Sequence, residues 1–252
     1  MLLTDPPYNV GLGWHMRPSE AKQLHRRTDG LVIENDKWDS DDEFEGFLRE
    51  AIGNAASVIR EGAAFYIWHA HNLSEPFFRA VRECGLTVRQ CLVWAKNTFA
   101  LGRQDYQWRH EPCLYGWKDG AAHYFFDSRT ETTVIEDAKP DPKKMTKAEL
   151  VELAESLLTE GRASTVLEFD KPSRSEEHPT MKPVKLFAYL VRNSSRPGDL
   201  VLDPFAGSGT TVMACEQLKR RAAVMELDPH YASVIVERWE RLTGKTAVRA
   251  DG

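Results

Sequence analysis

The stretch DPFAGSGTT at residues 203–211 directly follows the apolar run Leu200–Leu202. A second proline-rich stretch, DPPY at residues 5–8, follows Leu2 and Leu3 in the same way. An apolar run that ends in such a loop is typical of open α/β sheets, which build ligand sites at the carboxyl ends of their strands. We therefore predict two strand-end loops, far apart in the chain, that both carry function.

Helices and strands alternate around these two stretches. The 3.6-residue period predicts helices at 41–59, at 184–193, at 210–218, at 231–243, and from a Ser74 cap to Gly85. Short apolar runs predict strands at 63–68, 88–94, 111–117, 200–203 and 222–226. This alternation predicts a mostly parallel sheet.

The regular alternation is lost between Lys118 and Lys182. Pro140 and Pro142 interrupt the chain there, and a polar helix is expected from Thr146 to Gly161. We expect this segment to form a small separate module.

The composition of the 252 residues limits the classes of protein. A formal charge of -5 gives no global attraction to nucleic acid, so binding to DNA would need local basic clusters. No apolar run approaches the ~18 residues of a membrane span, and no signal peptide is visible. The four cysteines lack the CxxC spacing of zinc sites, so we expect reduced thiols in a cytoplasmic protein, no membrane association and no metal.

The loop at residues 203–211 differs from the common nucleotide-binding loops. A Walker A loop needs a lysine after its last glycine, but Thr210 follows Gly209. A dinucleotide fingerprint needs a third glycine at the position of Val212.

Together, DPPY and DPFxGxGTT resemble the DNA amino-methyltransferases, which use S-adenosylmethionine (SAM) to methylate the exocyclic nitrogen of adenine or cytosine. The order, with DPPY first, matches the permuted β group of that family. The resemblance implies an α/β, Rossmann-like SAM-dependent methyltransferase fold, circularly permuted, with an inserted recognition module. The implied parts are a catalytic half at 1–118, a target-recognition module at 119–182 and a SAM-binding half at 183–252.

The resemblance makes Asp5, Pro6, Pro7 and Tyr8 the catalytic residues. The Asp5 carboxylate and the Pro6 carbonyl can each accept one N–H of a target amino group, which favours a more reactive nitrogen. The Tyr8 ring offers a face on which an extruded base can stack. A turn without function would explain the same residues, because DPP is good turn chemistry.

Two further segments resemble cofactor elements of the family. Glu226 ends the strand after the glycine-rich loop, where a carboxylate can accept the ribose hydroxyls of SAM. The HPTMKP stretch at 178–183 resembles the HPTxKP element, whose threonine and lysine lie near the methionine end of the cofactor. The implied cofactor-binding residues are Asp203, Phe205, Ala206, Gly207, Ser208, Gly209, Thr210, Glu226, Thr180 and Lys182.

The implied partner is double-stranded DNA, which needs cationic and aromatic contacts. The resemblance leaves open a homodimer and a restriction endonuclease partner, and the sequence does not disclose a recognition site. The residues assigned to DNA from the basic clusters are Arg103, Trp108, Arg109, Lys143 and Lys144.

Two other patterns have plainer explanations. Pro112-Cys113 is the dipeptide of cytosine-C5 methyltransferases, but it lies inside a predicted strand. His69 and His71 would share one face of a strand as a metal pair, yet no carboxylate or cysteine stands at supporting spacing, which favours polar packing.

The sequence thus predicts an adenine-N6 DNA methyltransferase, because Asp rather than Ser opens the catalytic motif. Cytosine-N4 methylation and a catalytically silent DNA-binding subunit are the alternatives. Methyltransferases of RNA or protein amides usually carry Asn in this motif and place the SAM motif first.

The beginning of the chain leaves little room for a first strand, because only four residues precede Asp5. We expect either that this chain was separated from a longer polypeptide or that the strand is short and supported by neighbours. The apolar residues 246–248 are the expected neighbour, since permutation brings the old ends together.

Overall fold

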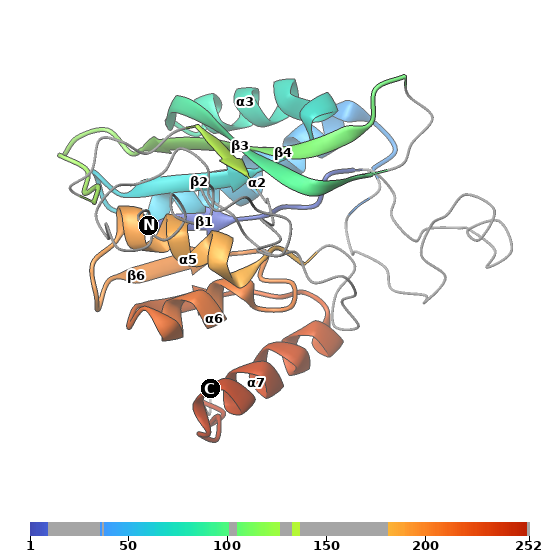
Figure 1. The fold of residues 1–252 in the computed structure, drawn as a ribbon. Coiled ribbons are helices and arrows are strands. Elements are labelled where there is room, and N and C mark those ends of the chain that lie inside the picture. Colours follow the sequence, from blue (N-terminus) through green and yellow to red (C-terminus); the bar gives the residue numbers. More distant parts are fainter. Residues whose placement is uncertain (10–35, 37, 101–104, 127–132, 137–180, 251–252) are drawn as a thin grey trace, which may run out of the picture.

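The computed structural model describes residues 1–9, 36, 38–100, 105–126, 133–136 and 181–250. Over these residues the chain forms a seven-stranded sheet between two layers of helices (Figure 1). The strands are β1 (Leu2–Thr4), β2 (Ala64–Trp68), β3 (Thr87–Ala100), β4 (Trp108–Trp117), β5 (Val134–Glu136), β6 (Leu200–Asp203) and β7 (Arg221–Val224). The helices are α2 (Asp41–Val58), α3 (Ser74–Glu83), α5 (Val184–Ser194), α6 (Thr210–Gln217), α7 (Pro229–Thr243) and the short 3₁₀ helix η1 (His71–Leu73).

The strand order is β5-β3-β4-β2-β1-β6-β7. The pairs β1–β2, β1–β6, β6–β7 and β3–β5 are parallel, whereas β4 runs antiparallel to both β2 and β3. The predicted α/β fold with a mostly parallel sheet is therefore confirmed, and β4, which runs against the other six strands, makes the sheet mixed. The short connection between β3 and β4 explains this reversal, because parallel neighbours need a longer crossover.

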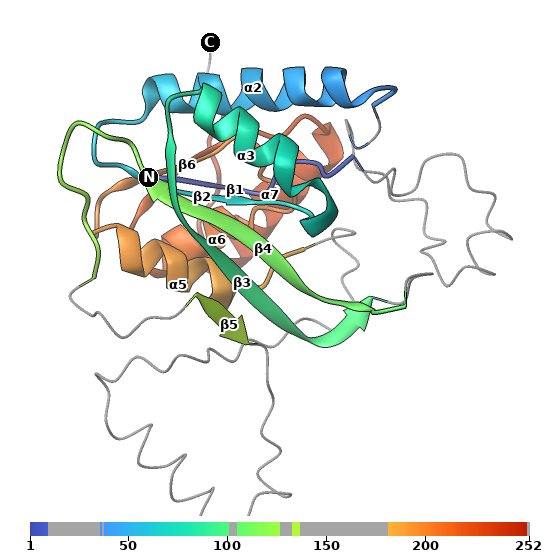
Figure 2. The same cartoon turned by 90° about the horizontal axis from the view of Figure 1, so that it is seen from above.

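The helices cover both faces of the sheet, with α2 and α3 on one face and α5 and α6 on the other (Figure 2). Successive strand residues point to opposite faces. Leu2 packs with Phe65 and the α2–α3 layer, and Leu3 packs with Tyr66 and the α5–α6 layer. Each layer therefore buries its own hydrophobic cluster.

Local signals in the sequence explain where the helices begin and end. The Ser40 side chain accepts a hydrogen bond from Glu43 N at 3.2 Å, and the acidic first turn of α2 complements the helix dipole. Asp228 caps α7 in the same way, and Gly244 ends that helix with a φ of 68°. Ser74 was expected to cap α3 but is its first residue, and its hydroxyl donates to His71 O.

Most element boundaries agree with the sequence patterns, and the largest differences lie in β3 and β4. Both strands extend beyond the predicted ranges 88–94 and 111–117, because they pair with each other past the end of β2. The last strand was expected at 222–226 but ends at Val224. The helix expected from Thr146 lies outside the described residues.

The first strand is short and lies at the centre of the sheet. Leu2 is in register with Phe65 of β2 and with Leu202 of β6, and it is fully buried. The expected pairing with residues 246–248 is wrong, because both edges of β1 are already occupied. Val248 follows the end of α7 and is 91% exposed. A short strand supported by neighbours is therefore what the structure contains.

None of the helices in the described part of the chain is long and apolar enough to cross a membrane.

Candidate active site

A pocket of about 620 Å³ lies at the carboxyl ends of β1, β6 and β7. Because β1 and β6 are parallel neighbours, the loops that follow them meet at one edge of the sheet. The pocket is lined by both sequence motifs, by the segment after β7 and by one side of α2. Its polar and charged lining residues include Asp5, Tyr8, Asp36, Asn54, Lys182, Asp203, Ser208, Thr210, Glu226 and Asp228.

The DPPY motif directly follows β1 and places two polar side chains in contact. The Tyr8 hydroxyl donates a 2.5 Å hydrogen bond to Asp5 Oδ1. The Tyr8 backbone N–H donates to Asp36 Oδ1 at 3.0 Å, which joins the motif to Asp36. The Tyr8 ring lies edge-on to Phe77, with the ring centroids 6.3 Å apart. Pro6 and Pro7 line the pocket beside them.

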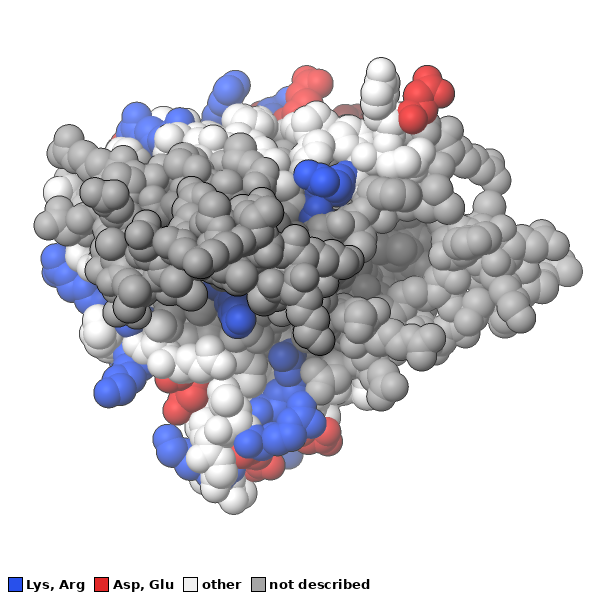
Figure 3. All heavy atoms as spheres, viewed as in Figure 1, with Lys and Arg blue, Asp and Glu red and all other residues white. Residues whose placement is uncertain are grey.

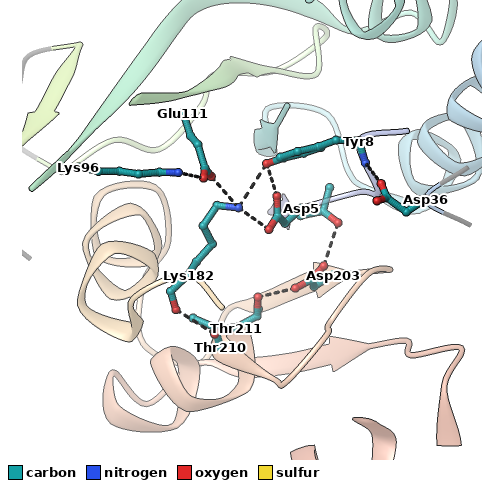
Figure 4. A network of polar contacts seen from close by, with 10 residues as sticks. Asp5, Tyr8, Asp36, Lys96, Glu111, Lys182, Asp203, Thr210 and Thr211 are labelled. Atoms are coloured by element: carbon teal, nitrogen blue, oxygen red, sulfur yellow. Dashed lines mark hydrogen bonds and ion pairs between the residues drawn. The ribbon is translucent and has the colours of Figure 1, made fainter. Parts of the chain in front are cut away.

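Lys182 lies at the centre of the polar network in Figure 4, although only 5% of its side chain is exposed. Its amino group is 2.5 Å from Asp5 Oδ2 and 2.9 Å from Glu111 Oε2. It also donates to the Tyr8 hydroxyl at 3.3 Å. Lys96 forms an ion pair with the other oxygen of Glu111. Two ammonium groups and two carboxylates therefore alternate from Lys96 to Asp5.

Burial and pairing act in opposite directions on these charges. Burial by itself raises the pKa of Glu111, but the ammonium groups of Lys182 and Lys96 outweigh it and lower that pKa to about 2. Burial also raises the pKa of Asp5, and Lys182 offsets only part of this effect, so the net shift is upward. Burial lowers the pKa of Lys182, yet Asp5 and Glu111 raise it overall. At neutral pH, Lys182 and Glu111 are thus both charged.

Asp203 begins the glycine-rich loop, and hydrogen bonds engage both of its carboxylate oxygens. Thr4 and the Phe205 N–H donate to Oδ1 at 2.8 and 3.1 Å. Thr211 donates to Oδ2 at 2.5 Å. Burial raises the pKa of Asp203 to about 6. Asp203 therefore lines the pocket while it joins β1, β6 and α6.

Glu226 follows β7 and accepts two backbone hydrogen bonds. The Gly207 N–H donates to its Oε2 at 2.7 Å, and the Asp228 N–H donates to its Oε1 at 3.0 Å. Each carboxylate oxygen has two acceptor positions, so Glu226 can still bind hydroxyl groups of a ligand. Met225 and Leu227 line the pocket on either side of Glu226 and are 64% and 66% exposed, which leaves apolar surface for a flat ring.

The two glycines of the loop have different surroundings. Gly207 has a φ of 53° and lines the pocket. Gly209 does not line it: this residue caps α6 with a φ of 84°, and an added Cβ would lie 2.9 Å from Ile235 of α7. Gly209 thus packs against α7, and its contact with the cofactor stays a prediction. Thr210 begins α6 and donates to the Lys182 carbonyl at 3.2 Å.

Of the residues assigned to DNA, the structure describes Trp108 and Arg109, which are both exposed at the start of β4. The Trp108 ring packs beside His71 and His110, at centroid distances of 5.0 and 5.3 Å. On the face shown in Figure 3, the Lys and Arg side chains of the described residues are spread out rather than gathered. Arg103, Lys143 and Lys144, and also Thr180 of the cofactor set, lie outside the described residues.

Of the two rejected patterns, Cys113 and His69 are packed into the fold, whereas His71 lies in η1 rather than on a strand and is exposed. Cys113 is fully buried within β4, and burial raises its pKa well above the ordinary value. His69 is buried against Phe77, with Nδ1 3.0 Å from Ala70 O. In the part of the chain that the structure describes, no three metal-ligating side chains come together.

Glu111 and Asp36 are site residues that sequence reasoning missed. Glu111 lies at the amino end of a strand, and Asp36 lies in a long segment without periodicity. Lys96 of β3 forms an ion pair with Glu111. The one available signal for Glu111 was a carboxylate directly before the apolar residues 112–115 of a predicted strand.

The fold matches solved SAM-dependent DNA methyltransferases. The M1.HpyAVI–SAM complex aligns with a TM-score of 0.59 and 21% identity, over 94% of this chain and 87% of the other. The cytosine-N4-specific PvuII DNA methyltransferase aligns with a TM-score of 0.60 and 16% identity, over 96% and 83%. The fold is therefore that of a SAM-dependent DNA methyltransferase.

The sequence itself matches the DNA methylase family model of N6 and N4 methyltransferases over residues 1–237, and the chain belongs to this family. It is 26% identical to the DNA adenine methyltransferase YhdJ of Escherichia coli K12 over 243 residues, which are 94% of this chain and 75% of YhdJ. The predicted family and cofactor are thereby confirmed: the protein is a DNA methyltransferase whose cofactor is SAM.

Proposed function

We propose that this protein transfers a methyl group from SAM to the N6 amino group of an adenine that has been rotated out of double-stranded DNA. The observation that carries the proposal is the placement of Asp5 and Tyr8 on the same pocket as Gly207 and Glu226. A target amino group and a cofactor bound to these two sides of one pocket would lie next to each other.

The residues of the DPPY motif suit an exocyclic amino group. The Asp5 carboxylate uses one position on each oxygen for Tyr8 and Lys182, so further acceptor positions remain. It and the Pro6 carbonyl would each accept one N–H of the target. These acceptors favour a more tetrahedral nitrogen, and Asp5 is placed to take the proton that the nitrogen loses after transfer.

The residues after β6 and β7 suit the cofactor. The volume of about 620 Å³ lies within the usual range for a ligand of this size. Glu226 would accept ribose hydroxyls, Gly207 allows close approach to the backbone, and the apolar surface of Met225 and Leu227 suits a purine ring. SAM supplies an activated methyl group when it is bound. Because its methyl group is already activated, the protein needs no covalent nucleophile.

Adenine is favoured over cytosine by two observations. The catalytic motif opens with Asp5 rather than Ser, and the relative YhdJ is named a DNA adenine methyltransferase. Cytosine-N4 methylation is the second candidate, since the PvuII enzyme shares the fold and is cytosine-N4-specific. Nucleoside analysis of DNA methylated by the purified protein separates them: N6-methyladenine is expected, and N4-methylcytosine would overturn the adenine assignment.

Base rotation accounts for a target that stacks on Tyr8, because an amino group inside the duplex cannot reach the pocket. An adenine analogue that fluoresces when unstacked, placed at the methylated position, should brighten on binding. Unchanged fluorescence under saturating protein would count against rotation.

Residues 119–182, with Lys143 and Lys144, are proposed as the recognition module. Trp108 and Arg109 are proposed as additional DNA contacts.

A catalytically silent DNA-binding subunit is a different class of function. The complete set of pocket residues argues against it, because a silent subunit would not need Asp5, Tyr8 and Glu226 around one cavity. Calorimetric titration with SAM tests this directly. Binding in the micromolar range is expected for the enzyme, and no binding would favour the silent subunit.

A further inference from the structure

The Lys182 amino group is almost enclosed by acidic and aromatic groups. Asp5 and Glu111 contact it with their carboxylates, at 2.5 and 2.9 Å. The rings of Tyr8 and Trp68 have their centroids 5.4 and 5.5 Å from the same nitrogen. Cation–π contacts of this kind add to the attraction of the carboxylates. A long, mobile side chain is thereby fixed in one position.

The antiparallel direction of β4 brings Glu111 to this position. Glu111 pairs in register with Trp94 of β3, and Lys96 lies two residues further along β3. Because β4 is antiparallel to β2, the amino end of β4 lies at the edge where β1 and β2 have their carboxyl ends. Glu111 thus approaches the DPPY motif from the β2 and β4 side of β1, whereas β6 lies on the other side of β1.

We propose that Lys182 and Glu111 are positioning residues for methyl transfer: Glu111 holds the Lys182 ammonium, and Lys182 holds the Asp5 carboxylate in place. This inference rests on the proposed function of Asp5. It assigns Lys182 to the catalytic carboxylate, whereas the sequence motif suggested the cofactor. It also gives Glu111 and Lys96 a part in the reaction, since Lys96 fixes the far oxygen of Glu111.

The contact with Lys182 stabilises the charged form of Asp5. A carboxylate in a half-buried site loses hydration, which favours its neutral form. The neutral form would accept hydrogen bonds less well and could not take a proton. The positive charge of Lys182 lowers the pKa of Asp5 and so opposes this effect, whereas the negative charge of Glu111 raises that pKa. Among the described residues, the other titratable groups that face Asp5 are the neutral Tyr8 hydroxyl, the buried thiol of Cys113 and the carboxyl of Asp203.

The two positioning residues therefore have opposite electrostatic effects on Asp5. Their removal should move the titration of Asp5 in opposite directions, which is a direct test. Lys182→Met removes the cation and should move the titration of Asp5 to higher pH by about 1–3 units. Glu111→Gln removes the competing anion and should move it to lower pH. The double variant should fall between the two, because the two residues act on the same carboxylate.

The experiment follows Asp5 directly and the reaction separately. The ¹³Cγ resonance of Asp5, identified by its loss in Asp5→Asn, gives its titration in protein with labelled aspartate. The kcat for methyl transfer to unmethylated DNA is measured at saturating SAM, and SAM affinity is measured by calorimetry. Glu45→Gln is the matched control, because Glu45 is 17% exposed and paired with Arg79, much as Glu111 is 20% exposed and paired with lysines.

The expected result is a kcat reduced about tenfold or more in Lys182→Met, with the acidic limb of its pH profile moved as the resonance moves, and an unchanged SAM affinity. Glu111→Gln should lower kcat less, and Glu45→Gln should behave as wild type. If Lys182→Met does not fold, the opposite shift in Glu111→Gln decides the question.

Two results would overturn the inference. One is an Asp5 titration that is the same in all variants. The other is a Lys182→Met protein that binds SAM weakly but has a normal kcat once saturated, which would make Lys182 a cofactor residue. If the titrations shift as expected but wild type methylates no DNA, the proposed function fails and the electrostatic coupling stands.

Discussion

The Thr4 hydroxyl donates a 2.8 Å hydrogen bond to Asp203 Oδ1, and this buried contact joins the ends of β1 and β6. The two strands carry the two motifs, so one hydrogen bond fixes the DPPY loop against the glycine-rich loop. Thr211 and the Phe205 N–H complete the environment of the carboxyl. A shift of this contact would therefore change the distance between cofactor and target.

Asp203 should make the stability of the protein depend on pH. Its pKa is about 6 in the folded state and 3.8 ordinarily, so the folded state binds more protons between these values and loses stability as pH rises through them. The pKa difference corresponds to about 3 kcal/mol. Urea unfolding from pH 4 to 7 should show a steeper loss of stability with rising pH in wild type than in Asp203→Asn. Parallel curves would contradict it.

Asp5→Ala should abolish methyl transfer and leave the fold intact, because the proposed role of Asp5 is at the target nitrogen and its side chain lies outside the hydrophobic core. We expect a loss on the order of 100-fold or more in kcat. The measurement is the initial rate of methyl incorporation into DNA, with thermal unfolding as the control for folding. Activity within about threefold of wild type would remove Asp5 from the mechanism.

Tyr8→Ala should lose more activity than Tyr8→Phe, because base stacking requires the ring. The phenylalanine variant still loses the 2.5 Å hydrogen bond to Asp5, so its kcat should fall by a smaller factor and its affinity for DNA should stay near that of wild type. Rates and DNA affinities of both variants provide the comparison. Equal losses in the two variants would mean that the hydroxyl, not the ring, is what matters.

The two glycines of the SAM loop should respond differently to substitution. Gly207→Val fills the approach to the pocket and should raise the Kd for SAM. Gly209→Ala meets Ile235 and requires a strained backbone, so it should reduce the free energy of unfolding by about 1–3 kcal/mol. Calorimetry with SAM and urea unfolding separate the two effects. A Gly207→Val protein with unchanged SAM affinity would exclude the loop from the cofactor site.

The position of β1 predicts which end of the chain matters for stability. The amides of Leu2 and Leu3 should exchange slowly with solvent, because β1 lies between two strands. Removal of residues 246–252 should change the Tm little, although Ala247 N donates to Glu240. Rapid exchange at Leu2 and Leu3, or a large loss of Tm on truncation, would contradict this arrangement.

Sequence patterns predicted the elements that have strong local signals. The periodicity of α2, its acidic first turn, and the apolar runs of β2 and β6 each specify their own structure. The position of Glu111 could not be predicted, because the rule that sites form at strand carboxyl ends applies to parallel strands and β4 is antiparallel. The contact of Asp5 with Lys182 depends on tertiary packing between residues 177 positions apart. The recognition module and the permuted chain order stay predictions.

The central position of β1 also has a consequence for how the protein folds. Its partner β2 begins at Ala64, whereas its other partner supplies Leu202 to pair with Leu2. Until β6 docks, one edge of β1 has unpaired amide and carbonyl groups, the kind of edge that can pair with another chain. Contacts between residues so far apart in the sequence form slowly, because the entropy of closing a long loop is lost before the contact stabilises the chain. The strand order therefore implies that, during folding, the docking of β6 onto β1 competes with the association of β1 with other chains.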